Sequence, residues 1–313
     1  MKIVYMGTPD FAVESLDAIC LAGHEVVGVV TVPDRKTGRG QKVTYSPVKN
    51  YALEHQLPLL QPEKLRDEQF LSELQKLHAD IFVVVAFRML PKCVWAMPPM
   101  GTFNLHASLL PQYRGAAPIN WALINGEERT GVTTFMLNEK IDEGGILLQQ
   151  ETPISENDNA ESLHDRLAEM GRKLVVETLT GLEKGTLKPQ TQHETSQLKA
   201  APKIFKDDCT IDWSKNGKEI RDFVRGLSPY PAATLSTIDN KGTEQSVKIY
   251  EVAFEKAPNI AVGTIESDTK KYLKIGVRDG WVHILSLQMS GKRRISVEEF
   301  LRGYNITDWK LIS

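Results

Sequence analysis

Residues 101–145 read GTFNLHASLLPQYRGAAPINWALINGEERTGVTTFMLNEKIDEGG, and the rest of the chain is best interpreted outward from this stretch. In its first run the apolar residues Phe103 and Leu105 alternate with Asn104 and His106. This alternation predicts a strand that carries the amide and the imidazole on the same face. Two polar side chains therefore point in one direction at the start of an irregular, proline-containing segment.

The run TGVTTFMLN at 130–138 predicts a second strand, which is followed by Asp142 on a turn rich in glycine. In an open parallel sheet, ligands bind outside the carboxyl ends of the strands. We therefore expect Asn104, His106 and Asp142 to meet in one cleft.

These three residue types suit the attack of an amine on a formyl carbon. The oxyanion that forms needs hydrogen-bond donors, and protons must move from the attacking amine to the leaving nitrogen. An Asn is a neutral donor, a His donates or shuttles protons, and an Asp orients that His. Such a reaction requires neither a metal nor a covalent nucleophile. Without further context, however, a single His at a strand end is more often a structural hydrogen-bonding residue than a catalyst.

Composition indicates a globular protein of one large or two medium domains, with 313 residues, 41% hydrophobic and 25% charged. A net charge of −2 gives no global sign of nucleic-acid binding, so any RNA contact must use a local basic patch. The first residues, MKIVYMGTPDF, contain too short an apolar run for a signal peptide or membrane span. The three cysteines are far apart and lack metal-site spacing. We expect a cytoplasmic protein with no membrane or metal association.

Strand-like and helix-like runs alternate in the first half: KIVYMG at 2–7, a helix at 11–23, HEVVGVVT at 24–31 and ADIFVVVAF at 79–87. The pattern predicts an α/β fold, a Rossmann-like, mostly parallel sheet with helices on both faces. The turn at Gly7 and the later Asp34 are compatible with a nicotinamide dehydrogenase. That class needs a Gly-x-Gly-x-x-Gly fingerprint, which is missing here.

The C-terminal part changes character. Ser214 is expected to cap a short helix, and five strand-like runs follow at short spacing between 233 and 288. They predict a small antiparallel β-barrel. Residues 184–203 have no aromatic residue, which is typical of a surface linker. We therefore expect a catalytic domain at 1–187, a linker at 188–205 and a C-terminal β-barrel at 206–313.

Several sequence segments, taken in order, resemble the 10-formyltetrahydrofolate-dependent formyltransferases, in particular the members that act on methionyl-tRNA. They are MGTPDF, VPDRKTGRGQKVTYSPVK, NLHASLLPQYRGAAPINWALINGEERTGVT with Asp142 after it, APKI, IDWS and RGLSPYPAATL. The resemblance runs over nearly the whole chain. It implies transfer of the formyl group of 10-formyltetrahydrofolate, a donor co-substrate, to the free amino group of initiator methionyl-tRNA, giving formylmethionyl-tRNA for translation initiation.

The same resemblance implies roles for individual residues. Asn104, His106 and Asp142 match the catalytic positions of the family. Two segments match its folate-binding positions: Ser108, Leu109, Leu110 and Pro111 in SLLP, and Phe87, Met89 and Leu90 in AFRMLP. Family members commonly have AYGLILP at the second segment, and this chain is one residue shorter there. The departure falls on the backbone that contacts the pteridine ring in the resembled family.

The long loop between Pro33 and Pro47 is expected to bind tRNA. From charge alone its basic residues could grip phosphates or simply be solvated. In the resembled family an arginine of this loop contacts the acceptor arm of tRNA, and Arg39 matches it, with Arg35, Lys36 and Lys42 as further candidates. The family also has an oligonucleotide-binding-like, tRNA-binding domain where this chain has its predicted barrel.

Two other classes remain possible, and both are disfavoured by the sequence. A formyltransferase acting on an amino sugar nucleotide would share the NLH, SLLP and Asp pattern, but the GRG loop and the APKI and IDWS segments favour tRNA. A non-catalytic RNA-binding protein would need only the barrel and the basic loop, and the set Asn104, His106 and Asp142 argues against it. We expect a monomer.

Overall fold

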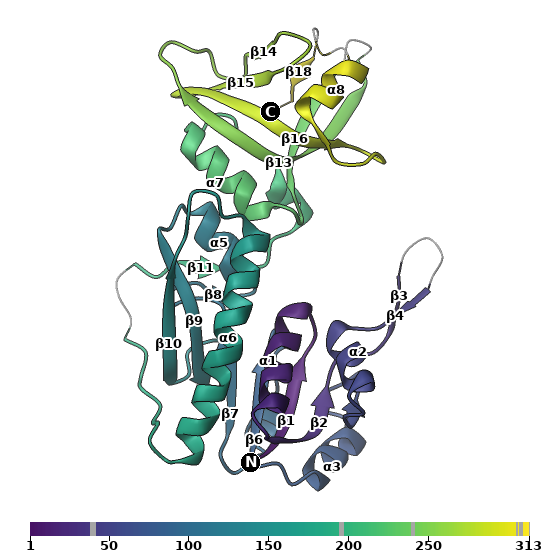
Figure 1. Ribbon diagram of the computed structural model, residues 1–313, viewed down its shortest axis with the longest axis vertical. Coiled ribbons are helices and arrows are strands. Elements are labelled where there is room, and N and C mark those ends of the chain that lie inside the picture. The colour runs from purple at the N-terminus through teal and green to yellow at the C-terminus, as the bar shows by residue number, and fades with distance from the viewer. Residues whose placement is uncertain (38–41, 194–196, 239–241, 305, 307–308, 313) are drawn as a thin grey trace. The chain divides into compact units, whose positions relative to one another are not determined.

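The computed structural model describes residues 1–37, 42–193, 197–238, 242–304, 306 and 309–312, and it divides into two compact units (Figure 1). The first unit contains Met1–Gly115, Arg129–Thr152 and His164–Ala200. The second contains Ala116–Glu128, Pro153–Leu163 and Ala201–Ser313. Among the described residues, none of the helices is both long and apolar enough to cross a membrane.

The first unit is built on a seven-stranded sheet. Its strands, in spatial order, are β10 (Ile146–Pro153), β9 (Arg129–Met136), β7 (Thr102–His106), β6 (Ile81–Val85), β1 (Lys2–Gly7), β2 (Glu25–Val30) and β5 (Leu59–Leu60). The pairs β7–β6, β6–β1, β1–β2 and β2–β5 are parallel. The predicted mostly parallel α/β sheet is thus confirmed.

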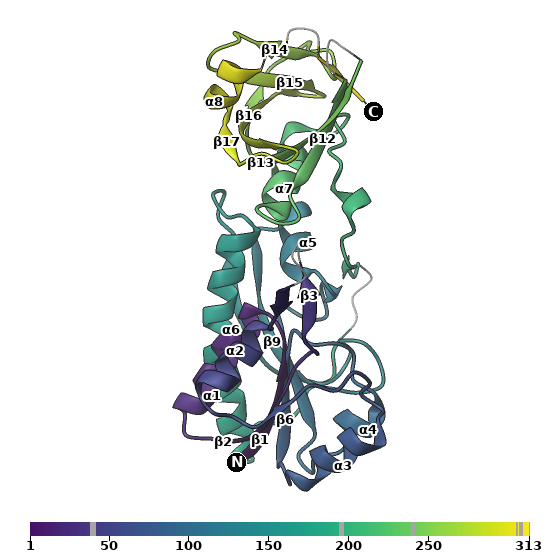
Figure 2. The ribbon, with the colours of Figure 1, turned by 90° about the vertical axis from the view of Figure 1, so that its right-hand side faces the viewer.

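Helices cover both faces of this sheet because its central strands are apolar on both sides. All five residues of β6 are buried, as expected for an interior parallel strand. One face of β1 and β6 packs against α3 (Glu68–Lys76) and α4 (Lys92–Trp95). The other face carries α1 (Asp10–Leu21), α2 (Pro47–Glu54) and α6 (Ala160–Glu183) (Figure 2). Tyr5 of β1 connects the sheet to α1, because its Oη donates to the Ala12 carbonyl at 2.5 Å.

The turn after β1 is a packing feature. A Cβ on Gly7 would lie 2.7 Å from Cβ of Ala12 and 3.1 Å from the carbonyl oxygen of Val85. Only glycine fits where the chain turns this closely from strand to helix. The tight-turn interpretation therefore explains Gly7 without a bound nucleotide.

Strand β9 is a reason why the sheet is mostly rather than wholly parallel. It runs antiparallel to β7, with Phe103 opposite Met136 and His106 opposite Thr133. The carboxyl end of β9 therefore lies beside the beginning of β7, away from His106. The expectation that Asp142 follows a parallel strand at the His106 edge was wrong, and residues 137–145 must turn back to bring it there.

The second unit contains an antiparallel sheet and a few short helices. The strand order is β14 (Ile265–Ser267), β15 (Leu273–Val277), β16 (Gly280–Met289), β13 (Glu244–Lys256), β12 (Ala233–Ile238) and β18 (Lys310–Leu311), with β17 (Ile295–Ser296) paired to β16. The hydrogen-bonded path along the described strands ends at β14 and β18, so the near-barrel sheet is not closed by pairing between these two strands. The helical segments are α5 (Pro118–Ile124), η1 (Lys206–Cys209), α7 (Gly217–Leu227) and α8 (Val297–Gly303).

The start of α7 lies two residues later than expected. Its N-cap residue is Asn216, whose backbone N–H donates to Glu219, whereas Ser214 Oγ donates to Asp212 at 2.6 Å. The helix ends at Leu227, two residues before Pro229.

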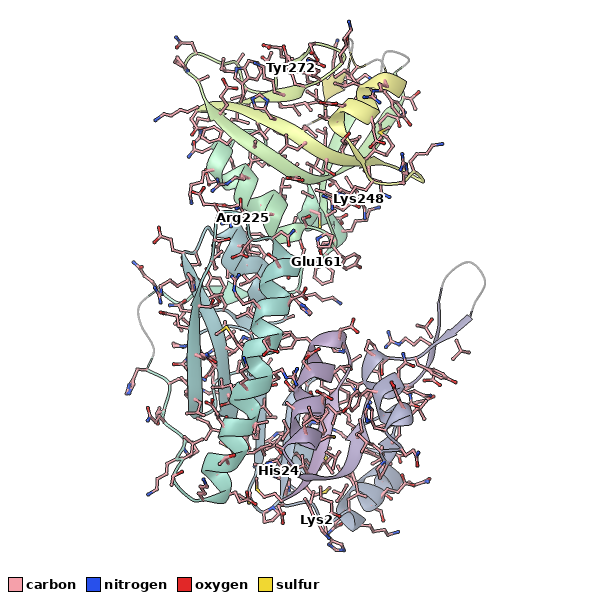
Figure 3. The ribbon with its side chains drawn as sticks, in the orientation of Figure 1. Lys2, His24, Glu161, Arg225, Lys248 and Tyr272 are labelled. Carbon is pink, nitrogen blue, oxygen red and sulfur yellow. The ribbon has the colours of Figure 1, made fainter. Side chains whose placement is uncertain are left out.

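Helix α5 and residues 153–163 group with the second unit because they pack on α7. Asn120 Nδ2 donates to the Gly226 carbonyl at 2.8 Å, and Arg225 Nη1 donates to the Ser155 carbonyl at 2.8 Å. Figure 3 labels Arg225 on this helix. The two short remaining strand pairs are β8 (Arg114–Gly115) with β11 (Ala200–Ala201) and β3 (Arg35–Thr37) with β4 (Lys42–Thr44). The division at 187 and 205 stays a prediction.

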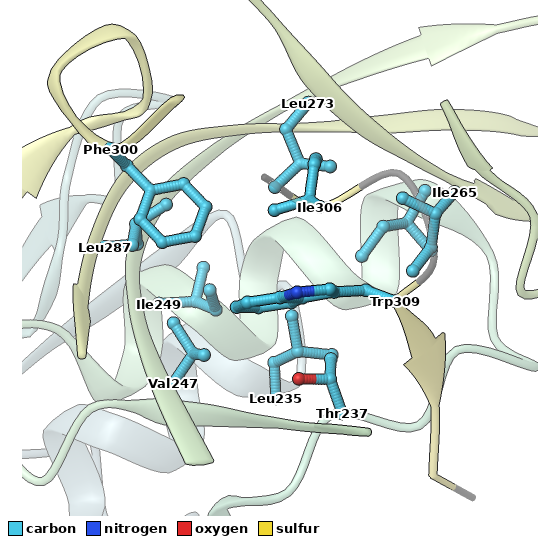
Figure 4. A pocket seen from close by; sticks show the side chains of 11 residues that line it. Leu235, Thr237, Val247, Ile249, Ile265, Leu273, Leu287, Phe300, Ile306 and Trp309 are labelled. Carbon is cyan, nitrogen blue, oxygen red and sulfur yellow. The ribbon is translucent and has the colours of Figure 1, made fainter. Parts of the chain in front are cut away.

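A small cavity lies within the core of the second unit, and Thr237 is one of its lining residues together with Leu235 and Trp309 (Figure 4). Thr237 is fully buried, and its Oγ1 has no hydrogen-bond partner among the described residues. A buried hydroxyl without a partner costs about 1–3 kcal/mol.

We expect Thr237→Val to raise the free energy of unfolding by about 1 kcal/mol, because valine has the same shape without the unsatisfied hydroxyl. Urea denaturation measures the change. Thr234→Val is the matched control on the same strand, and it should destabilise, because Thr234 Oγ1 donates to the Cys209 carbonyl at 3.2 Å. An equal decrease in the free energy of unfolding in the two variants would show that the Thr237 hydroxyl has a hydrogen-bond partner.

Candidate active site

His106 ends β7 and is almost fully buried, with 6% of its surface exposed. Its Nε2 lies 2.8 Å from the Tyr113 carbonyl oxygen, and its ring meets the edge of Phe135. A carbonyl oxygen only accepts hydrogen bonds, so Nε2 carries a proton. The Tyr113 carbonyl thereby fixes the ring, and Nδ1 is left facing Asp142.

Asp142 lies beside His106, as predicted, although it arrives by the 137–145 turn. Its Oδ2 is 4.0 Å from His106 Nδ1 and accepts a hydrogen bond from the Gly115 N–H at 2.9 Å. The backbone at Asp142 has a φ of 54°, in the left-handed region that aspartate tolerates better than most residues. The carboxylate is thus held at ion-pair distance from the imidazole, and such contacts shorten when a substrate completes the site.

Asn104 lies two residues before His106 on β7 and so shares its face. Its Oδ1 is buried, with no hydrogen-bond partner among the described residues. Buried amides are normally satisfied, and exceptions call for a reason such as a role at a binding site. The side-chain oxygen of Asn104 is therefore available to accept a hydrogen bond from a donor group of a ligand.

The SLLP segment follows shortly after β7, and its backbone is hydrogen-bonded to a side chain of β9. Thr133 Oγ1 donates to the Ser108 carbonyl at 2.6 Å and accepts from the Leu110 N–H at 3.2 Å. Gln149 Nε2 donates to the Leu110 carbonyl at 2.9 Å, and Ser108 Oγ donates to the Gln112 carbonyl at 2.6 Å. Leu109 and Pro111 are partly exposed. The backbone of the segment is thus fixed by side chains of β9 and β10.

The apolar side chains of the AFRMLP segment differ in how far they are buried. Leu90 is buried in the core against α3 and α4, Phe87 is half-buried, and Met89 is 73% exposed. Arg88 donates to the carbonyls of Pro62 and Glu63. Burial lowers the pKa of Arg88, and the nearby Arg35 charge adds to this effect.

The basic loop between Pro33 and Pro47 begins as the hairpin β3–β4. Arg35 is exposed there. Arg39 lies outside the described residues, and for Lys36 and Lys42 only the backbone is described. The structure thus places the base of the loop.

A buried lysine anchors that base. Lys49 Nζ lies 2.7 Å from Asp34 Oδ2 and 2.9 Å from Gln61 Oε1, and 10% of its side chain is exposed. The hydrogen bond from Lys49 lowers the pKa of Asp34 below its usual value. Asp34, a possible ribose ligand by sequence, is therefore used to hold the loop.

The structure adds residues that sequence patterns did not single out. Thr133 and Gln149 hold the SLLP backbone, and Gln192 is buried in the segment expected to be a surface linker. Arg114 donates to Gln192 and lies 3.5 Å from Glu143. No local pattern marks a buried glutamine in a polar segment. Within the described ranges, no group of three or more His, Cys, Asp or Glu side chains is placed to hold a metal ion.

Both units match families of known proteins. Residues 1–179 match the family "Formyl transferase", and residues 203–305 match "Formyl transferase, C-terminal domain". The chain therefore belongs to the formyl transferase family. The methionyl-tRNA formyltransferase of Bacteroides fragilis is 53% identical to it over 314 residues, which cover 98% of this chain and 96% of that protein. That of Parabacteroides distasonis is 54% identical over 312 residues, covering 97% and 96%.

A solved structure shares the fold. WlaRD, a sugar 3N-formyl transferase crystallised in the presence of dTDP and 5-N-formyl-THF, aligns with a TM-score of 0.64. Its sequence is 23% identical, and the alignment covers 94% of this chain and 99% of that chain. At this identity the likeness shows a common architecture.

Proposed function

We propose that this chain transfers the formyl group of 10-formyltetrahydrofolate to the free amino group of initiator methionyl-tRNA, giving formylmethionyl-tRNA for translation initiation. The observation that carries the proposal is the identity of 53% to a methionyl-tRNA formyltransferase over 98% of the chain. Such similarity extends over both units, so it includes the part expected to bind tRNA. The chemistry is assigned to the His106–Asp142 pair and to Asn104, whose buried side-chain oxygen has no hydrogen-bond partner among the described residues.

In the proposed reaction the amine of methionine attacks the formyl carbon, and Asn104 and His106 stabilise the oxyanion that develops. His106 handles protons, and Asp142 orients His106 and helps to deprotonate the amine. The bond between the formyl carbon and the folate nitrogen then breaks, and that nitrogen takes up a proton, which releases tetrahydrofolate. One oxyanion donor contributes about 10²–10³ in rate, and general acid–base catalysis contributes about 10²–10⁴. Because both ring nitrogens of His106 face protein oxygens, substrate binding must exchange one of these contacts for the oxyanion.

We place the folate against the two segments that flank the end of β7. Ser108, Leu109, Leu110 and Pro111 would form one wall, with Phe87, Met89 and Leu90 on the other segment. The exposure of Met89 supports contact with a ligand, whereas the burial of Leu90 restricts its contribution to the backbone. Backbone contacts tolerate the departure of AFRMLP from the common family sequence.

The tRNA contacts are assigned to Arg35, Lys36, Arg39 and Lys42 and to the C-terminal domain. Basic side chains on phosphates position a nucleic acid without reading its sequence. In the C-terminal domain Lys274 is already paired with Glu266 at 2.9 Å, whereas Lys248 on β13 donates to the Pro231 carbonyl and is labelled in Figure 3. We propose a monomer that acts in the cytoplasm.

A panel of acceptors tests the proposed function. The purified chain is incubated with 10-formyltetrahydrofolate and, separately, initiator methionyl-tRNA, elongator methionyl-tRNA and an amino sugar nucleotide. Rapid formylation of the initiator alone is expected. Transfer to the sugar alone would keep the chemistry and refute the RNA acceptor, and transfer to no acceptor would favour a binding protein.

Gly144 offers a test of the turn that carries Asp142. A Cβ at this position would lie 1.6 Å from the Met136 carbonyl oxygen, so any side chain must displace the turn. A misplacement of about 1 Å can cost about 10² in rate. We expect Gly144→Ala to lower kcat for formyl transfer at least about tenfold. Gly303→Ala is the matched control, because nothing lies within 4 Å of its added Cβ. Normal kcat in Gly144→Ala would show that the turn adjusts freely.

A further inference from the structure

Gln192 is buried beside the turn that carries Asp142, with 8% of its surface exposed. Its Nε2 donates to the carbonyls of Asp142 and Gly144, both at 2.8 Å. Its Oε1 accepts from Arg114, at 3.2 Å from Nε and 2.8 Å from Nη2. A carboxamide has two donor hydrogens and two acceptor lone pairs, so all of its hydrogen-bonding capacity is used here.

The backbone just before Gln192 is also held by hydrogen bonds. Gln190 pairs with Ile146, the first residue of β10, through two backbone hydrogen bonds of 2.7 and 2.8 Å. Residues 190–192 therefore run alongside the point where the Asp142 turn rejoins the sheet. Arg114 completes the arrangement, because its guanidinium contacts both Gln192 and Glu143.

The turn needs such a restraint. Asp142 adopts a left-handed φ of 54°, a conformation that costs energy and persists only when its surroundings fix it. Gln192 holds the carbonyl of Asp142 and the carbonyl two residues later, and so it defines the path of the backbone between them. The position of the carboxylate, 4.0 Å from His106, depends on that path.

We propose that Gln192 is a positioning residue that holds Asp142 in its working place beside His106. The proposal rests on the catalytic role proposed above for Asp142. It gives the segment between the two matched domains a part in the active site, in addition to joining them.

Gln192→Glu tests the proposal with a nearly isosteric change. The new carboxylate keeps an acceptor for Arg114 but faces the carbonyls of Asp142 and Gly144 without a proton to donate. We expect kcat for formyl transfer to fall at least about tenfold, with KM for the donor and for methionyl-tRNA within about threefold, because a misplaced catalytic group mainly affects kcat. Gln190→Glu is the matched control: it makes the same change two residues away on an exposed side chain, and normal kinetics are expected.

A double-mutant cycle separates positioning from general damage. In an Asp142→Ala background, Gln192→Glu should change kcat by less than about twofold, because the group it positions is already absent. A full additional loss of tenfold would overturn the proposal. So would normal kcat in Gln192→Glu when Asp142→Ala is inactive, and that pair of results would leave the proposed function standing. Normal activity of Asp142→Ala would overturn the catalytic assignment itself, and the positioning role with it.

Hydrogen exchange gives a readout that does not depend on activity. Amides in residues 137–145 of Gln192→Glu should exchange faster, while those of β1 and β6 should not change. Uniformly faster exchange, or none in the turn, would contradict the proposal. If Gln192→Glu does not fold, Gln192→Met removes the same hydrogen bonds without adding a charge, and the same changes in kcat and exchange are expected.

Discussion

His106→Ala is expected to lower kcat for formyl transfer to methionyl-tRNA by at least about 10², because general acid–base catalysis typically contributes about 10²–10⁴. The imidazole is buried at the end of β7 and lies next to a carboxylate. Removing it deletes the proposed proton carrier and one oxyanion donor. Single-turnover formylation with the enzyme in excess measures the chemical step without contributions from product release.

Two controls accompany His106→Ala. One shows that the variant is folded, and the other shows that removal of a different histidine leaves kcat unchanged. Circular dichroism and the unfolding midpoint should show a folded protein, since a single buried hydrogen bond is worth about 1 kcal/mol. His164→Ala removes a half-buried histidine of α6 that also lies next to an aspartate, at 2.9 Å from Asp165, and whose ring packs against Phe11 rather than beside Asp142. It should retain normal kcat. Near-normal transfer by a folded His106→Ala would contradict the catalytic role.

Asp142→Ala is expected to cause a comparable loss, at least about 10² in kcat, because the carboxylate orients His106 and assists in deprotonating the amine. Asp142→Asn separates two contributions. The amide can still accept the hydrogen bond from the Gly115 N–H, now 2.9 Å from Oδ2, but it carries no charge and is not a base. A large loss in both variants indicates that the charge is required, and recovery in Asp142→Asn would indicate orientation alone.

Glu143→Gln is the control for a carboxylate on the same turn. Glu143 lies 3.5 Å from Arg114 and 3.1 Å from Lys140, and its side chain is partly exposed. We expect a change in kcat below about threefold, as is usual when a partly exposed ion pair is lost. A loss in Glu143→Gln as large as that in Asp142→Ala would show that the turn as a whole, rather than Asp142, determines the rate.

The sequence predicted the parts of the fold that depend on local pattern. The continuous apolar run of β6 indicated a strand buried on both faces. The alternation of apolar and polar residues in β7 indicated a strand with Asn104 and His106 on the same face. The short, regularly spaced runs after Ala233 likewise predicted an antiparallel sheet, which the structure confirms. Such features are set by a few neighbouring residues, so one sequence is enough to read them.

Features that depend on distant partners were not predicted. The antiparallel direction of β9 is decided by pairing with β7 and by the 137–145 turn, and strand direction leaves no mark in hydrophobic periodicity. Gln192 is buried by contacts with Asp142, Gly144 and Arg114, which lie far from it in sequence. Leu90 and Met89 are adjacent and apolar, yet only packing against α3 and α4 determines that one is buried and the other exposed.

The central claim is that formyl transfer takes place at Asn104, His106 and Asp142, and a structure of the complex with 5-formyltetrahydrofolate tests it most directly. We predict the ligand between the SLLP and AFRMLP segments, with its formyl group near the Asn104 amide and the His106 ring, within hydrogen-bond reach of about 3 Å of at least one of them. A folate bound instead at the Gly7 turn, or on the C-terminal sheet, would contradict the account.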